Sequence, residues 1–189
     1  MIGIGIVGMP GSGKSILSEA ARRLGIPVFV MGDAVREETL RRGLALTAEN
    51  VLRVAGELRK KYGRGAVAHL IVEKIRDRVP EKVKLVVIEG LRSPEERKIF
   101  ERYFDRFLVI AVHASPNTRY SRIVGRHRTD DAKTIDMLVK RDEKELEFGI
   151  GALLAMADVH LVNEEKTKDE FLAECTRVLK NIATSLEAT

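Results

Sequence analysis

The chain has 189 residues, of which 44% are hydrophobic and 5% aromatic, so it can bury the core of one domain but not of two large ones. No run approaches the roughly 18–20 consecutive apolar residues of a membrane-spanning helix, and the first residues lack the features of a signal peptide, which argues against a membrane or secreted protein. Because Cys175 is the only cysteine, no intrachain disulfide can form, and we expect a cytoplasmic protein.

The charge is moderately basic, with 33 Lys and Arg against 28 Asp and Glu and a net charge of +5. Such an excess suits a salt-bridged surface or a polyanionic small ligand. Nucleic acid is the less favoured partner, because tryptophan is absent and the Phe and Tyr residues fall in apolar patterns rather than among basic ones.

Short apolar runs alternate with amphipathic stretches along the chain. Strands are predicted at 2–7, 27–31, 83–88, 107–112 and 158–162, and the clearest helices at 15–24, 94–103, 117–126 and 168–185. This alternation is typical of βαβ units and predicts an α/β fold with a parallel sheet covered on both faces. Two segments interrupt it, a helical insert at 33–79 and a charge-rich insert at 119–147. With no repeat or linker in the sequence, we expect one domain, 1–189, that carries both inserts.

The first strand leads into a complete phosphate-loop (P-loop) motif, G-x-x-x-x-G-K-[ST]. It consists of Gly8, Met9, Pro10, Gly11, Ser12, Gly13, Lys14 and Ser15. Glycines let successive backbone N–H groups point at phosphate oxygens, and the helix that follows presents its positive end to the same group. We therefore expect the motif to bind ATP, with Lys14 on the β- and γ-phosphates and the Ser15 hydroxyl on Mg²⁺; the alternative is a glycine-rich turn without a ligand.

A carboxylate, Glu89, follows the buried apolar run at 85–88. At the end of a strand beside the P-loop it is suited to hold Mg²⁺ through water, or to cap the next turn. Asp33 also follows a strand and is a rival for this role. Asp33 is equally suited to orient an acceptor hydroxyl or to cap the helix after it.

Two arginines, Arg36 and Arg92, also follow strand ends, where ligands of open α/β sheets bind. The planar guanidinium grips a phosphate with two hydrogen bonds, so this pair predicts a second anion site for a small-molecule nucleotide acceptor. Solvated surface arginines are the alternative.

The charge-rich insert contains Arg119, Arg122 and Arg126 at spacings of three and four, which places them on one face of a helix. Arg128 and Arg141 follow. Stacked like charges need neutralising anions. Either nearby aspartates such as Asp142 form a salt-bridged surface with them, or they form a cationic lid that closes over a triphosphate during phosphoryl transfer.

These elements, in this order, resemble the nucleoside monophosphate kinase family, and most closely the archaeal adenylate kinase-related proteins. The resemblance rests on the P-loop, Gly32-Asp33-x-x-Arg36, Glu89-Gly90-x-Arg92 and Arg122-Ile123-Val124-Gly125-Arg126. It implies a three-layer P-loop fold with five parallel strands in the order 2-3-1-4-5, a helical acceptor-binding insert and an arginine-rich lid.

The resemblance also implies roles for individual residues. Arg36 and Arg92 would hold the acceptor phosphate, Arg122 would stack near the donor base, and the loop from Asn163 would border the adenine. Arg126, Arg128 and Arg141 would line the transferring phosphoryl group. The chain departs from adenylate kinases at Glu96, where they have a glutamine that reads adenine, so the base of the acceptor is left open.

Three functions remain in view. The first is a kinase that transfers the γ-phosphoryl of Mg-ATP to a nucleoside monophosphate. The second is a related kinase for a hydroxyl acceptor such as dephospho-coenzyme A, for which Asp33 would be the more important residue. The third is a regulatory or nucleic-acid-associated ATPase, in which Arg36 and Arg92 would have no evident use.

Overall fold

The computed structural model describes residues 1–125 and 134–187 of the chain. Within them, five parallel strands form a sheet in the order β2-β3-β1-β4-β5, so the predicted fold class and strand order are confirmed. The strands are β1 (Ile2–Val7), β2 (Val28–Val30), β3 (Leu85–Glu89), β4 (Arg106–His113) and β5 (Val159–Val162). β2 is shorter than expected because the chain enters a helix at Met31.

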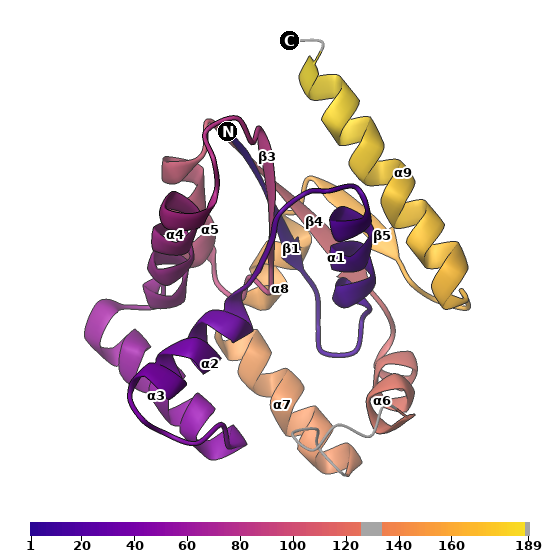
Figure 1. Ribbon diagram of the computed structural model, residues 1–189. Helices are drawn as coiled ribbons and strands as arrows, with labels where there is room; N and C mark the ends of the chain where they lie inside the picture. The colour runs from indigo at the N-terminus through magenta and orange to yellow at the C-terminus, as the bar shows by residue number, and fades with distance from the viewer. Residues whose placement is uncertain (126–133, 188–189) are drawn as a thin grey trace.

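Helices cover both faces of this sheet (Figure 1). The helices of the described residues are α1 (Lys14–Arg23), α2 (Met31–Arg41), α3 (Ala48–Tyr62), α4 (Ala66–Arg78), α5 (Pro94–Tyr103), α6 (Pro116–Gly125), α7 (Ile135–Glu147), α8 (Ile150–Ala155) and α9 (Lys168–Glu187). α1 and α9 lie on one face, and α4, α5 and α8 on the other. None of these helices has the length and apolar character of a membrane span.

The sequence of β1 shows why side chains pack differently on the two faces of the sheet. Ile4 and Ile6 point into the cluster beneath α1 and α9, which also contains Phe171. Glycine alternates with them on the opposite face, where a Cβ at Gly3 would lie 2.6 Å from the Phe104 ring. The small residues therefore let the aromatic side chains of the second cluster approach the strand directly.

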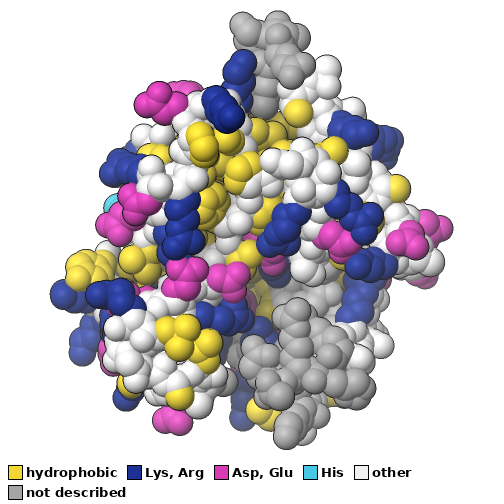
Figure 2. Space-filling model, viewed as in Figure 1, with side chains coloured by type: hydrophobic (Ala, Val, Ile, Leu, Met, Phe, Trp, Pro, Cys, Tyr) yellow, Lys and Arg dark blue, Asp and Glu magenta, His cyan; other side chains and the backbone are white. Residues whose placement is uncertain are grey.

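Four helices of the two inserts lie at the carboxyl-terminal end of the sheet. In Figure 1, α2 and α3 lie on one side of this end, and α6 and α7 extend from it. The last helix of the first insert, α4, instead covers the sheet, since Ile71 and Ile75 are buried in one cluster with Val86 and Ile88 of β3. Basic and acidic side chains are interspersed over the face shown in Figure 2.

Candidate active site

The P-loop connects β1 to α1, and its glycines are required by conformation and by space. Gly11 and Gly13 have φ angles of 82° and 104°, a backbone conformation that residues with a side chain rarely adopt. A Cβ at Gly13 would lie 2.2 Å from Nδ2 of Asn163, and one at Gly11 would lie 2.6 Å from the carbonyl oxygen of Arg119. The N-cap residue of α1 is Gly13, which has no side chain to cap the helix, so the N–H groups at this end can face an anion.

Residues far along the sequence hold this loop in place. The Arg119 guanidinium donates to the carbonyl of Pro10 (3.1 Å), and the Asn163 amide donates to the carbonyl of Ser12 (2.9 Å). Arg122 in turn donates to the Asn163 carbonyl (3.0 Å). Asn163 is only 2% exposed, so it lies beneath the P-loop and braces it from the side of β5.

The expectation that Arg119 belongs to a cationic lid of exposed arginines is wrong. This side chain is 3% exposed and pairs with Asp142 of α7, with 2.5 Å between Nη2 and Oδ2. The spacing of three correctly relates Arg119 to Arg122 on one helix face, but that face of α6 packs against the P-loop and α7. Arg119 therefore pairs with Asp142 as the salt-bridge alternative expected, but in a buried contact and not on the surface. Arg126 and Arg128 lie outside the described residues.

A cleft of about 480 Å³ opens beside the P-loop at the carboxyl-terminal edge of β1 and β3. Most of the residues expected to bind ligands line it. These are Gly8, Pro10, Gly11, Gly13, Lys14, Ser15, Asp33, Arg36, Glu89, Arg92, Arg122 and Arg141, whereas Met9, Ser12 and Asn163 are not among its lining residues. The cleft is strongly polar and carries more cationic than anionic side chains, which suits an anionic ligand.

Lys14 lies at the base of this cleft. Its ammonium donates to the carbonyls of Gly8 (2.7 Å) and Met9 (3.1 Å). Burial lowers the pKa of Lys14 to about 8, while the carboxylates of Glu89 and Glu145 act in the opposite direction. The Lys14 ammonium and the arginines that line the cleft provide positive charge for a phosphate chain, and Glu89 and Glu145 offset part of it.

Oxygen donors suited to Mg²⁺ are present at the same edge. The Ser15 hydroxyl is exposed in the first turn of α1, and Glu89 is the last residue of β3. Ser18 donates to Glu89 Oε2 (2.6 Å), which orients the carboxylate, while the other oxygen makes no hydrogen bond within the described residues. Glu89 therefore does not cap a helix, and its free oxygen fits a hard cation or its water shell.

The two arginines at strand ends both line the cleft, and each is paired with a carboxylate. Arg36 Nη1 lies 2.6 Å from Asp33 Oδ1 within the first turns of α2, where the N-cap position is Val30 and not Asp33. Arg92 Nε lies 3.0 Å from Oε2 of Glu145. Glu145 was not found from the sequence, because its place in the cleft depends on how α7 packs.

Glu96 does not face the cleft as the comparison with a base-reading glutamine suggested. It forms a capping box with Ser93 at the start of α5 and accepts from the backbone N–H of Arg92 (2.7 Å). The side chain is 1% exposed, and burial raises the pKa of Glu96 to about 7. A glutamate three residues after a serine is itself a capping-box signal, so the sequence contained this information.

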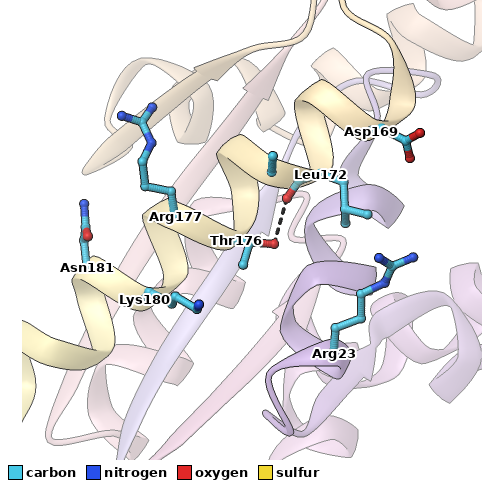
Figure 3. Close-up of a pocket in the computed structure, with 8 residues that line it drawn as sticks. Arg23, Asp169, Leu172, Thr176, Arg177, Lys180 and Asn181 are labelled. Atoms are coloured by element: carbon cyan, nitrogen blue, oxygen red, sulfur yellow. Dashed lines mark hydrogen bonds between the residues drawn. The ribbon is translucent and has the colours of Figure 1, made fainter.

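A second hollow, of about 550 Å³, lies between α1 and α9 (Figure 3). It is a shallow groove lined by Arg23 and by one face of α9 that includes Thr176, Arg177 and Lys180. Thr176 donates within α9 to the carbonyl of Leu172 (2.8 Å). No strand end and no P-loop residue contributes to this groove, so the cleft beside Lys14 is the candidate active site.

The fold and the cleft together define a P-loop protein, with a five-stranded parallel sheet whose first strand leads into the glycine loop. A family model described as an AAA domain matches residues 7–138, which is most of the chain. The chain is 45% identical over 177 residues to a UPF0200 protein of Hyperthermus butylicus, covering 94% of this chain and 92% of the relative. It is 44% identical over 179 residues to a UPF0200 protein of Pyrococcus horikoshii, covering 94% of this chain and 95% of the relative. The chain therefore belongs to the UPF0200 family and contains an AAA domain.

Solved structures with the same fold include small kinases. TT1252 from Thermus thermophilus aligns with a TM-score of 0.65 and 21% identity over 98% of this chain and 97% of that chain. A gluconokinase from Sinorhizobium meliloti aligns with a TM-score of 0.58 and 21% identity, over 98% of this chain and 95% of that chain. A shikimate kinase from Bacteroides thetaiotaomicron aligns with a TM-score of 0.57 and 17% identity, over 95% of this chain and 98% of that chain. At these identities the likeness shows a common fold.

Proposed function

We propose that this protein is an ATP-dependent phosphotransferase that moves the γ-phosphoryl of Mg-ATP to a nucleoside monophosphate or a related small phosphorylated acceptor. One observation carries the proposal: Arg36 and Arg92 line the same cleft as Lys14 and Ser15. An ATPase needs one phosphate site, whereas a kinase needs a second site for the acceptor anion. The order of motifs along the chain supports a relation to nucleoside monophosphate kinases, and the small kinases of similar fold support phosphoryl transfer.

On the donor side, the P-loop N–H groups and Lys14 would hold the β- and γ-phosphates. Ser15 and Glu89 would hold Mg²⁺, which when bound neutralises phosphate charge. Arg122 would contact the donor base, with Asn163 bracing its loop. Arg126, Arg128 and Arg141 would stabilise the transferring group, from a lid formed by residues 119–147.

On the acceptor side, the insert at 33–79 would contribute Arg36, and the loop after β3 would contribute Arg92. A phosphate oxygen of the acceptor forms a bond to the γ-phosphorus while the bond to the β,γ-bridging oxygen breaks, and ADP leaves with that electron pair. Such an acceptor already carries an ionised oxygen, so no catalytic base is required. We propose that both inserts belong to one functional unit.

A hydroxyl acceptor is the second candidate, and the position of Asp33 favours it. The Asp33 carboxylate lines the cleft and is 58% exposed, so it can accept a proton from an alcohol once Arg36 moves aside. The gluconokinase and the shikimate kinase of similar fold are named for alcohol-bearing substrates. Replacing Asp33 by Asn would lower turnover of a hydroxyl acceptor about 100-fold or more, but that of a phosphate acceptor only a few-fold.

The test is ADP release from Mg-ATP, alone and with each of AMP, CMP, GMP, UMP, dTMP and dephospho-coenzyme A. We expect release to depend on one or more monophosphates, to be lost in Lys14→Ala and to fall about 100-fold or more in Arg92→Ala. Release that ignores every acceptor, or that rises only with RNA or DNA, would replace the kinase by a regulatory ATPase.

A further inference from the structure

Arg92 contacts carboxylates of two helices, one through its backbone and one through its side chain. Its backbone N–H donates to Glu96 Oε2 of α5 (2.7 Å), and its Nε forms an ion pair with Glu145 Oε2 of α7 (3.0 Å) that lacks the alignment of a hydrogen bond. Both carboxylates are largely buried, with whole-residue exposures of 1% for Glu96 and 8% for Glu145. An arginine held this way loses little side-chain freedom when it binds a ligand.

Arg59, on α3, is a further positive charge close enough to interact with the two carboxylates. Its guanidinium stacks over the Phe148 ring, 4.6 Å from the ring centre, just beyond the end of α7. Burial lowers the pKa of Arg59, and the charges that act on it are Glu96, Arg92 and Glu145. Arg59 therefore belongs to the charge environment of Arg92, although it does not line the cleft.

The contact to Glu145 leaves the far end of Arg92 available. Glu145 comes closest at Nε, and within the described residues Nη1 and Nη2 of Arg92 make no hydrogen bond. The Arg92 side chain is 34% exposed and lines the cleft. The terminal pair of N–H groups is the part of a guanidinium that grips an oxyanion with two hydrogen bonds.

We propose that Glu145 is a positioning residue that holds Nε of Arg92 so that its terminal N–H groups face the acceptor's phosphate. The inference rests on the proposed function, because it takes Arg92 as the acceptor-binding residue. The alternative is that Glu145 occupies the place of the acceptor's phosphate, competes with it and weakens its binding. Removal of the Glu145 carboxylate would then lower the acceptor KM, whereas the positioning role predicts that this KM rises.

Steady-state kinetics of two Glu145 variants show whether the acceptor KM rises or falls. Glu145→Met keeps the length of the side chain but removes its carboxylate. We expect the KM for the phosphoryl acceptor to rise about 10-fold, while the KM for ATP and kcat stay within about twofold. Glu145→Gln keeps an oxygen for Nε and should recover most of the acceptor affinity, which a packing role alone would not require. Glu143→Gln, exposed on the same helix, is the control with the same charge change. An acceptor KM that falls or stays unchanged in both Glu145 variants would overturn the proposal.

Sulfate binding separates this inference from the proposed function. If no acceptor is phosphorylated, the proposed function has failed, but calorimetric titration of sulfate into Mg-ADP-loaded protein still reports on Arg92. We expect sulfate binding to be lost in Arg92→Ala and about 10-fold weaker in Glu145→Met. Sulfate that binds Glu145→Met as tightly as the unchanged protein, or that does not depend on Arg92, would overturn the positioning role. If Glu145→Met does not fold, Glu145→Gln carries the test, with a rise of about threefold in the dissociation constant expected and no rise contradicting it.

Discussion

Lys14 is buried, whereas its proposed role at the phosphates of ATP requires its charge. In the free protein its pKa is about 8, lowered by burial from 10.5, so the ammonium is about half deprotonated at that pH. A bound phosphate chain favours the charged form, so binding above pH 8 requires proton uptake.

We therefore predict that Mg-ATP affinity is nearly constant from pH 6.5 to 7.5 and weakens by up to about tenfold per unit above pH 8. Calorimetry at several pH values, in buffers of different ionisation enthalpy, measures both the affinity and the proton uptake. Lys14→Met, which binds more weakly, should lack this pH dependence. The same slope in that variant would assign the titration to another group.

Asn163 braces the P-loop without lining the cleft. Replacing it by Ala removes the donor to the Ser12 carbonyl (2.9 Å) and an oxygen that lies 3.3 Å from the Arg122 guanidinium. We predict a loss of about 1–3 kcal/mol in the free energy of unfolding, because a buried carbonyl is left without its partner, and weaker Mg-ATP binding. Chemical denaturation measures the first effect and calorimetry the second. Asn181→Ala, exposed on α9, is the matched control and should change neither.

The capping box of α5 links the stability of an element to pH. Folding raises the pKa of Glu96 from 4.5 to about 7, because burial outweighs the favourable charges of Arg92 and Arg59 and the N–H groups of Arg92 and Ser93. A raised pKa means that the folded state binds the proton more tightly than the unfolded chain. This contribution to stability is complete below pH 4.5 and is lost as the pH rises through 7.

Glu96→Gln removes this titration and keeps an oxygen for the Arg92 and Ser93 N–H groups. We predict that its free energy of unfolding, relative to that of the unchanged protein, increases from pH 4.5 to pH 7.5 and is constant above. Guanidinium unfolding across this range provides the measurement. Glu95→Gln, at the neighbouring exposed position, should show no such trend. A flat difference for Glu96→Gln would mean that its carboxyl does not titrate in this window.

The Arg119–Asp142 pair joins α6 and α7 to the P-loop. Asp142 accepts from both terminal nitrogens of Arg119 (3.0 and 2.5 Å) and from the Tyr120 hydroxyl (2.9 Å). Asp142→Ala leaves the buried guanidinium without its carboxylate, and we predict a loss of about 3–5 kcal/mol in stability. Glu143→Ala, one position along and exposed, should cost less than about 0.5 kcal/mol. Denaturant unfolding of both variants measures the difference, and equal values would deny the pair a structural role.

At the scale of the whole molecule, local sequence patterns predicted the framework. The period of the apolar residues located the strands, and the glycine motif after β1 located the loop that Gly11 and Gly13 now form with positive φ angles. Arg36, Glu89 and Arg92 could be expected in one cleft because they follow parallel strands, whose ends meet at one edge.

The rest of the site depends on packing that no local pattern contains. Helical spacing relates Arg119 to Arg122 but does not say that this face turns inward against the P-loop. Glu145 pairs with Arg92, and Arg59 interacts with it through charge, only because α7 and α3 lie near the loop after β3, far from it in sequence. Their own neighbours in the chain contain nothing that marks them.

The central claim is that the γ-phosphoryl group passes to an acceptor rather than to water. The most direct measurement uses ATP labelled with oxygen-18 on the γ-phosphoryl group, with mass spectrometry of the products formed with and without a nucleoside monophosphate. We predict that the label appears in a phosphorylated acceptor, that little labelled inorganic phosphate forms, and that Arg92→Ala loses this transfer. Label found in inorganic phosphate whatever acceptor is present would contradict the account and identify an ATPase.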